Sequence, residues 1–87
     1  MTFVSKTLPE FWDCYRGLPL EIQRRADKQF ALLRENPAHP SLQLKPVGEF
    51  WSCRVSEAYR ALAVRDGNTF TWFWIGTHDG YERLLSD

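Results

Sequence analysis

Residues 50–85 read FWSCRVSEAYRALAVRDGNTFTWFWIGTHDGYERLL, and this stretch decides the fold. From Phe50, apolar and polar residues alternate with the period of two that is typical of a strand with one buried face. The turn signal Asp66-Gly67-Asn68 then separates two further runs, as in a β-hairpin. The second run, 69–76, is almost entirely apolar, which indicates a central strand covered on both faces. We therefore expect strands at 50–56, 59–65 and 69–76.

The preceding sequence predicts a short strand at 2–6 and two helices. Thr7-Leu8-Pro9-Glu10 has the pattern of a capping box, which predicts a first helix that ends at Gly17. Pro19 opens a second helix that ends at Asn36-Pro37. Residues 37–46 contain three prolines and are expected to be extended and irregular.

These elements predict one α+β domain spanning residues 1–87, in which an N-terminal strand and two helices pack on a three- to four-stranded antiparallel sheet. The second helix should bury one face and leave the other solvated. Its expected buried residues are Ile22, Ala26, Phe30 and Leu33, and its expected solvated residues are Glu21, Arg24, Arg25, Asp27, Lys28 and Arg34.

The composition limits the class of protein. An apolar content of 44% with 15% aromatic residues allows a compact core in one small domain of 87 residues. Eleven Lys and Arg balance eleven Asp and Glu, so any electropositive patch must be local. The two cysteines lack C-x-x-C spacing, which favours reduced thiols in the cytosol. With no signal-peptide pattern and no long apolar run, the sequence predicts a cytoplasmic protein with no membrane partner.

Two arginines on the predicted strands are candidates for phosphate binding. Arg54 lies mid-strand and Arg60 begins the next strand, so a hairpin between them brings both guanidinium groups to one patch. Two such groups can hold a phosphate from two sides. The alternative is that each arginine forms a structural ion pair with Glu49 or Glu57.

Other candidates lie at the ends of the predicted sheet. His78 follows the last strand, where an imidazole can act as acid or base near neutral pH, or simply as a polar surface or capping residue. Tyr81 can stack on a base or bind phosphate, or merely cap the sheet. Arg83 follows it, and Lys45 offers a point charge ahead of the strands. No cofactor motif is present, and Cys14, Cys53, His39 and His78 lack ligand-like spacing, so no metal site is expected.

Four short motifs resemble the C-terminal two-thirds of RelE/ParE superfamily toxins from bacterial toxin–antitoxin pairs. They are Trp-x-x-Arg-Val (51–55), Tyr-Arg-Ala-Leu (59–62), Trp-Ile-Gly-x-His (74–78) and Tyr-x-Arg-Leu-Leu (81–85). The resemblance implies the same order of elements as the one expected above. Family members divide into ribosome-dependent mRNA endonucleases and gyrase inhibitors. The insertion Asp79-Gly80, between His78 and Tyr81, differs from the shorter His-Tyr ends of the family.

Resemblance to the mRNA-cleaving branch implies a metal-independent attack of a 2′-hydroxyl on the adjacent phosphate. It assigns catalysis to a first group of positions, namely Arg54 and Arg60 for phosphate stabilisation, Glu57 as base and His78 as acid. It assigns RNA binding to a second group, namely Lys45, Tyr81 and Arg83. The implied partners are a cognate antitoxin, the ribosome and mRNA.

Two alternatives to the endonuclease stay open. One is a ParE-like, non-enzymatic inhibitor of DNA gyrase, which the zero net charge favours. The other is a decayed or repurposed toxin fold that only binds its antitoxin. Retention of Arg60 and His78 favours the enzyme.

Overall fold

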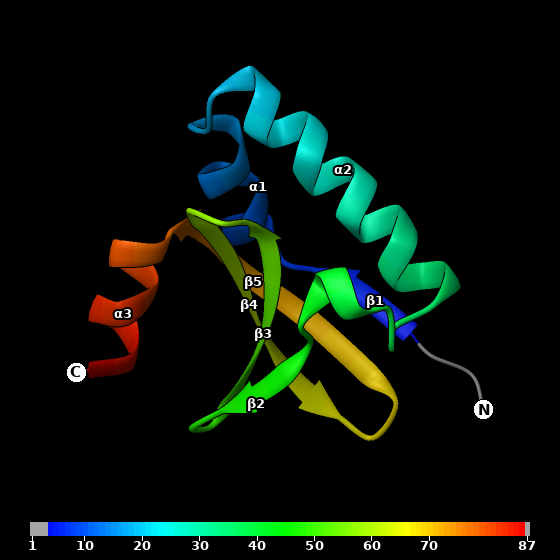
Figure 1. Cartoon of the computed structure of the whole chain (residues 1–87). Helices are drawn as coiled ribbons and strands as arrows, with labels where there is room; N and C mark the ends of the chain where they lie inside the picture. The colour runs from blue at the N-terminus through cyan, green and yellow to red at the C-terminus, as the bar shows by residue number, and fades with distance from the viewer. Residues whose placement is uncertain (1–3, 87) are drawn as a thin grey trace.

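The computed structural model describes residues 4–86, which form one mixed sheet and its helices (Figure 1). In chain order the elements are β1 (Val4–Thr7), α1 (Pro9–Arg16), α2 (Leu20–Glu35), the 3-10 helix η1 (Pro40–Leu42), β2 (Lys45–Val47), β3 (Phe50–Ser56), β4 (Tyr59–Asp66), β5 (Thr69–Thr77) and α3 (His78–Ser86). None of the helices in this range is long and apolar enough to cross a membrane.

The α+β class and the order of elements are confirmed, but the sheet has more strands than expected. Its order is β1-β5-β4-β3-β2, with β1 parallel to β5 and the other neighbours antiparallel. The additional strand is β2, which lies in the stretch expected to be irregular. Pro46 is tolerated there because β2 is an edge strand with only one neighbour.

The N-terminal elements differ in detail from the sequence pattern. The first strand runs from Val4 to Thr7, and residues 2 and 3 of its expected range lie outside the described residues. The predicted capping box is wrong, because Leu8 is the N-cap of α1 and no side chain caps that helix. Thr7 belongs to β1 instead, where its hydroxyl accepts a hydrogen bond of 3.0 Å from the indole nitrogen of Trp12.

Helices α1 and α2 cover one face of the sheet, where aromatic rings build the core. Phe30 meets Phe11 and Trp72 edge to face, with centroid distances of 5.3 and 5.7 Å. Phe11 and Trp72 are completely buried, and each such side chain contributes about 1.5–3 kcal/mol. The buried indole N–H of Trp72 donates to the Ser5 hydroxyl at 3.0 Å. This core fixes the sheet and leaves its other face for α3 and the cationic residues.

Candidate functional site

Arg54 and Arg60 stand directly opposite each other on β3 and β4, as expected from the hairpin. Like charges in this arrangement destabilise a sheet. Neither arginine forms an ion pair with any acid in residues 4–86, so the alternative pairings with Glu49 or Glu57 do not form there. Both side chains are half-buried. The two strands therefore present adjacent positive charges that lack a protein counter-ion within the described chain.

The Arg60 guanidinium is held by the hairpin that carries it. Its Nη1 donates to the carbonyl oxygens of Ser56, Tyr59 and Glu57, at 2.5, 2.9 and 3.2 Å. A guanidinium has five N–H donors, and only those of Nη1 form hydrogen bonds within residues 4–86. The donors on Nε and Nη2 can therefore bind an external anion while Nη1 keeps the group in place.

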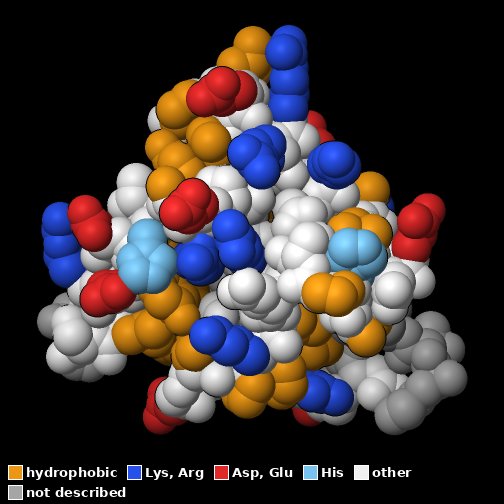
Figure 2. Space-filling view, viewed as in Figure 1, with side chains coloured by type: hydrophobic (Ala, Val, Ile, Leu, Met, Phe, Trp, Pro, Cys, Tyr) orange, Lys and Arg blue, Asp and Glu red, His pale blue; other side chains and the backbone are white. Residues whose placement is uncertain are grey.

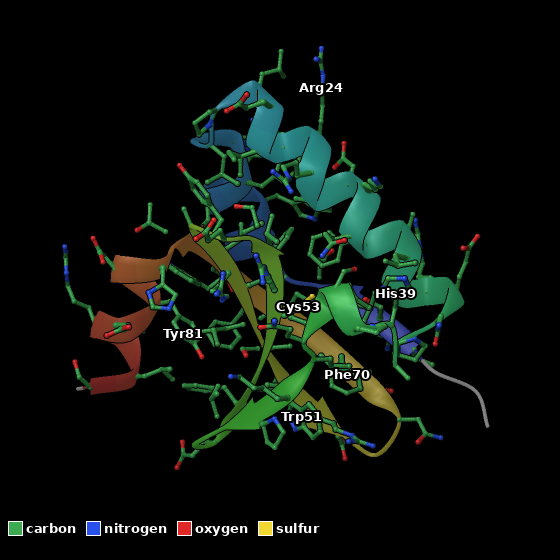
Figure 3. All side chains as sticks on the ribbon, in the orientation of Figure 1. Arg24, His39, Trp51, Cys53, Phe70 and Tyr81 are labelled. Carbon is green, nitrogen blue, oxygen red and sulfur yellow. The ribbon has the colours of Figure 1, made fainter. Side chains whose placement is uncertain are left out.

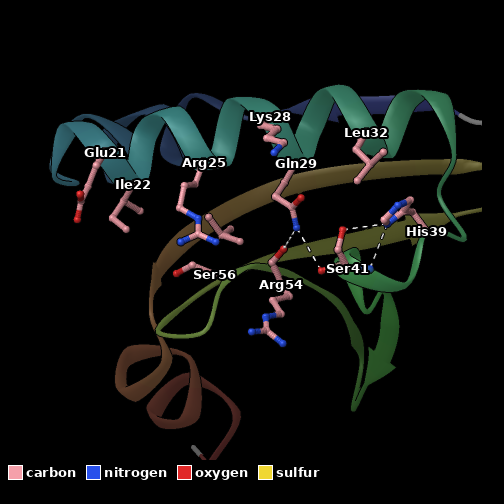
Figure 4. Close-up of a pocket in the computed structure, with 11 residues that line it drawn as sticks. Glu21, Ile22, Arg25, Lys28, Gln29, Leu32, His39, Ser41, Arg54 and Ser56 are labelled. Carbon is pink, nitrogen blue, oxygen red and sulfur yellow. Dashed lines mark hydrogen bonds between the residues drawn. The ribbon is translucent and has the colours of Figure 1, made fainter.

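Arg54 is positioned through its backbone. Gln29 on α2 donates its side-chain amide to the Arg54 carbonyl at 2.8 Å and to the Ser41 carbonyl at 3.2 Å. The guanidinium of Arg54 points away from α2 (Figure 4). The pairing register shifts between Arg54 and Ser56, an irregularity of the kind that redirects side chains near functional sites.

Lys45 extends the cationic surface along the same face. Lys45 on β2 pairs with Ser52, which lies two residues before Arg54 on β3. Because side chains alternate along a strand, Lys45, Ser52 and Arg54 share one face of the sheet. Figure 2 shows Lys and Arg side chains gathered in the middle of this view, with a histidine on either side.

His78 begins α3 beside the β3–β4 turn. Its backbone N–H donates to the Ala58 carbonyl at 2.7 Å, so His78 lies at the same end of the sheet as Glu57 and Arg60. Its Nδ1 lies 3.3 Å from Oε1 of Glu82, and 40% of its side chain is exposed. Sequence reasoning missed Glu82, although the i,i+4 spacing on a helix was a usable signal. The carboxylate orients the ring, and the exposed part can reach a ligand.

Tyr81 and Arg83 lie on α3 in different environments. Tyr81 is only 8% exposed, and its ring centroid lies 5.5 Å from that of His78. In this arrangement it supports His78, and stacking on an RNA base would require α3 to move. Arg83 is exposed in the last turn of α3. This burial fits the alternative that Tyr81 caps the sheet, and its extent depends on how α3 folds back onto β4 and β5.

The Asp79-Gly80 insertion has a structural role. A Cβ added at Gly80 would lie 3.2 Å from Cζ2 of Trp74, and one at Gly76 would lie 2.6 Å from the same atom. The Trp74 ring therefore occupies the space beside both glycines. This contact joins α3 to β5 and so fixes where His78 stands.

The four residues considered as zinc ligands do not form a ligand cluster. Residues 4–86 contain no group of three or more His, Cys, Asp or Glu that could hold a metal ion. His39 Nδ1 instead accepts a hydrogen bond of 3.2 Å from the Ser41 backbone and caps η1. Burial raises the pKa of the Cys53 thiol to about 12, although the positive charge of Arg60 acts in the opposite direction.

A mixed sheet with two helices packed on one face has the architecture of the RelE-like toxins. Several solved structures share this fold. A chain of the RelB–RelE antitoxin–toxin complex from Methanococcus jannaschii matches with a TM-score of 0.72 and 12% identity, covering 91% of this chain and 96% of that one. YafQ from E. coli strain BL21(DE3) matches with a TM-score of 0.67 and 12% identity, covering 92% and 98%. A RelE mutant from E. coli in the free state matches with a TM-score of 0.66 and 14% identity, covering 94% of this chain and 90% of that one.

The sequence itself identifies the family. A family model described as a ParE-like toxin domain matches residues 20–83. The chain belongs to this family, and it is a type II toxin of the RelE/ParE superfamily, as the four motifs indicated. A comparison with curated proteins found no match. The structural likenesses, at their low identities, establish the fold alone.

Proposed function

We propose that this toxin is a metal-independent endoribonuclease that cleaves mRNA on the ribosome. The observation that carries the proposal is the Arg54–Arg60 pair. These two cations stand opposite each other, and neither forms an ion pair with an acid of the described chain. Such an arrangement destabilises the free protein and becomes favourable when an anion binds between the groups. A phosphate of the RNA backbone supplies that anion.

The reaction is a transfer within the RNA. The 2′-oxygen bonds to the adjacent phosphorus, the bond from phosphorus to the 5′-oxygen breaks, and a cyclic phosphate and a 5′-hydroxyl result. Glu57 takes the proton of the 2′-hydroxyl, and His78 gives a proton to the leaving 5′-oxygen. Arg54 and Arg60 stabilise the charge that accumulates on the phosphorane.

The remaining residues hold the substrate and the acid. Lys45 and Arg83 bind neighbouring phosphates as exposed point charges. Glu82 and Tyr81 position the imidazole of His78 from the same helix. The turn that carries Glu57 is tied to His78 by the hydrogen bond from its backbone to Ala58. The turn that carries Glu57 and the start of α3 therefore lie at the same end of the sheet as the arginine pair.

We also propose that a cognate antitoxin neutralises this chain. Two of the structures that share its fold are described as RelB–RelE complexes from Methanococcus jannaschii and Pyrococcus horikoshii OT3. An antitoxin segment that covers the arginine pair would supply the missing counter-charges. If induction of the chain without an antitoxin leaves growth unchanged, the decayed-fold alternative gains.

Gyrase inhibition is the second candidate function. Its support is the balance of eleven Lys and Arg against eleven Asp and Glu, which is unusual for a protein that binds RNA. A supercoiling assay with purified gyrase distinguishes it from the endonuclease.

His78→Gln tests the proposed reaction, because glutamine keeps hydrogen bonding but cannot supply the titrating proton. Cleavage of a translated message, followed by primer extension, should fall by about 10² to 10⁴. The control is Arg24→Gln, which changes an exposed residue of α2 that points away from the sheet and should leave cleavage unaltered (Figure 3). Equal cleavage by His78→Gln and wild type would exclude His78 as the acid. Inhibited supercoiling with no cleavage by the wild type would support gyrase as the target.

A further inference from the structure

A second cationic feature lies between α2 and the outer edge of β3. A groove of about 990 Å³ runs there, and its lining includes the cations Arg25, Lys28 and Arg54 and one acid, Glu21 (Figure 4). Neither Arg25 nor Lys28 forms an ion pair within residues 4–86. In a protein with zero net charge, this groove concentrates positive charge in one place.

Helical spacing explains why these side chains meet in the groove. Arg25, Lys28 and Gln29 lie three and four residues apart, so they share one face of α2. Gln29 ties this face to the Arg54 and Ser41 carbonyls, and Arg25 points from the helix toward Ser56 (Figure 4). Arg24, the preceding residue, points away from the sheet (Figure 3). The helical pattern predicted one solvated face for Arg24, Arg25 and Lys28, but in the structure Arg24 points away from the sheet while Arg25 and Lys28 line the groove.

Arg54 connects the groove to the arginine pair. It lines the groove, while its guanidinium points away from α2 onto the face that carries Arg60 (Figure 4). A strand of RNA with one phosphate at the pair can therefore continue past Arg54 toward α2. We propose that this groove binds the phosphates of single-stranded RNA next to the cleaved one, through Arg25 and Lys28.

This assignment rests on the proposed function for the position of the cleaved phosphate, and the groove itself favours RNA over an acidic peptide. An extended peptide would add to the free edge of β3 through backbone hydrogen bonds. Gln29 already occupies the Arg54 carbonyl in the middle of that edge. A nucleic-acid backbone needs only cations at intervals, which Arg25 and Lys28 provide.

The experiment measures binding without cleavage. The probe is a short, fully 2′-O-methylated single-stranded RNA, whose affinity is followed by fluorescence anisotropy over a series of salt concentrations. Each phosphate contact adds about 0.7 to the slope of log affinity against log salt for single strands. Arg25→Ala should lower the slope by about 0.7, and the double variant with Lys28→Ala by about 1.4. Arg24→Ala removes the same charge from the preceding helix position and should leave the slope unchanged.

Several outcomes would overturn the groove as an RNA site. They are an equal effect of Arg24→Ala and Arg25→Ala, an unchanged slope in the double variant, and absence of measurable binding by the wild type at low salt. A polyglutamate peptide provides the competing class of ligand. If the double variant weakens peptide binding and leaves the RNA slope unchanged, the groove takes an acidic protein segment instead.

The two proposals fail separately. RNA binding that depends on Arg25, in a protein that cleaves no message, would reject the endonuclease and keep the groove. Cleavage that depends on His78, with the same RNA slope in Arg24→Ala and Arg25→Ala, would reject the groove and keep the endonuclease. Lys28→Ala alone tests the groove at an independent position, and thermal melting checks that each variant folds.

Discussion

At the residue scale, Arg60 joins the stability of the hairpin to the chemistry of the site. Its Nη1 donates to three carbonyl oxygens of the β3–β4 turn, including that of Glu57. These hydrogen bonds hold the guanidinium at the turn, on the face of the sheet that carries Arg54, so little side-chain freedom is lost when an anion binds. The same bonds fix the turn that carries the proposed base.

Substitution of Arg60 should separate these two roles. Arg60→Lys keeps a positive charge but loses the planar fork, and Arg60→Ala loses both. We expect cleavage to fall by about 10² or more in both variants. Arg60→Ala should also lower the free energy of unfolding by about 1–2 kcal/mol, because the loss of its hydrogen bonds outweighs the relief of repulsion from Arg54. Primer extension and urea unfolding provide the two measurements.

The control for Arg60 is Arg65→Ala on the same strand. The Arg65 guanidinium lies 4.8 Å from the ring centroid of Trp51, away from the arginine pair, and its removal should leave cleavage in place. A folded Arg60→Ala variant that cleaves like the wild type would contradict the proposed role in phosphate stabilisation.

Cys53 lies beside Arg54 in the sequence but is predicted to be chemically inert. It is 1% exposed, and burial raises the pKa of its thiol to about 12. Only the thiolate is a nucleophile. Iodoacetamide at about pH 8.5, where an ordinary exposed thiol is partly ionised, should therefore not label Cys53 in the native protein. Cys14 is half-buried and serves as the internal control. Mass spectrometry of native protein that shows Cys53 labelled faster than Cys14 would be inconsistent with this burial.

At the scale of elements, β5 is covered differently on its two faces. Trp72 and Ile75 belong to the core on the helix side, whereas the Trp74 ring lies beside Gly76 of the same strand and Gly80 of α3. This arrangement explains why residues 69–76 form an almost continuous apolar run. It also makes the position of α3, and with it that of His78, depend on the Trp74 ring.

Gly76→Ala tests this dependence. A Cβ at Gly76 would lie 2.6 Å from Trp74, so the ring must shift and α3 with it. We expect the free energy of unfolding to fall by about 1–3 kcal/mol, as for other overpacked sites, and cleavage to fall with it. The control is Gly17→Ala, whose Cβ would meet only the Cys14 carbonyl, at 3.5 Å. Equal stability of the two variants in urea unfolding would show that Trp74 adapts without cost.

The elements that sequence analysis located correctly are those with strong local signals. The period of two, the Asp66-Gly67-Asn68 turn and the prolines predicted β3, β4, β5 and α2 to within about a residue of their observed ends. Strand β2 was missed because a three-residue edge strand that contains Pro46 is defined by its partner and not by its own pattern. The capping box failed because Thr7 is part of β1, a contact distant in sequence.

The site could be predicted where it depends on one hairpin, and not where it depends on packing. The opposition of Arg54 and Arg60 follows from strand register alone. The groove requires α2 to lie along β3, which rests on the contact of Gln29 with Arg54, 25 residues away in sequence. The burial of Tyr81 likewise depends on the return of α3 to the sheet.

At the scale of the whole molecule, neutral net charge coexists with local cationic surfaces because several acids have partners elsewhere. Asp13 pairs with Arg16, Asp27 accepts a hydrogen bond from Tyr15, and Glu82 contacts His78. Arg25, Lys28, Arg54 and Arg60 form no ion pair in residues 4–86. Because long-range attraction is weak without net charge, binding of RNA should depend on contacts in these surfaces.

Alkaline pH should reveal how the two helices are held together. The Tyr15 hydroxyl donates to Asp27 at 2.7 Å and joins α1 to α2. This hydrogen bond, followed by burial and the charge of Asp27, raises the pKa of Tyr15 from 10.0 to about 12. Burial raises the pKa of Cys53 from 9.0 to about 12. Both groups therefore keep their protons more firmly in the folded state than in the unfolded state.

The sign of the pH dependence follows from this difference. Well below pH 9 both groups are protonated in either state, so their contribution to stability is fully present. As the pH rises toward 12, the unfolded chain releases these protons first, and the free energy of unfolding must fall. Tyr15→Phe removes the titrating hydroxyl, so its stability should start lower at neutral pH and fall less steeply between pH 10 and 12. Urea unfolding over this range provides the comparison. If the free energy of unfolding falls equally steeply with pH in Tyr15→Phe and wild type, ionisation of Tyr15 does not contribute to the loss of stability.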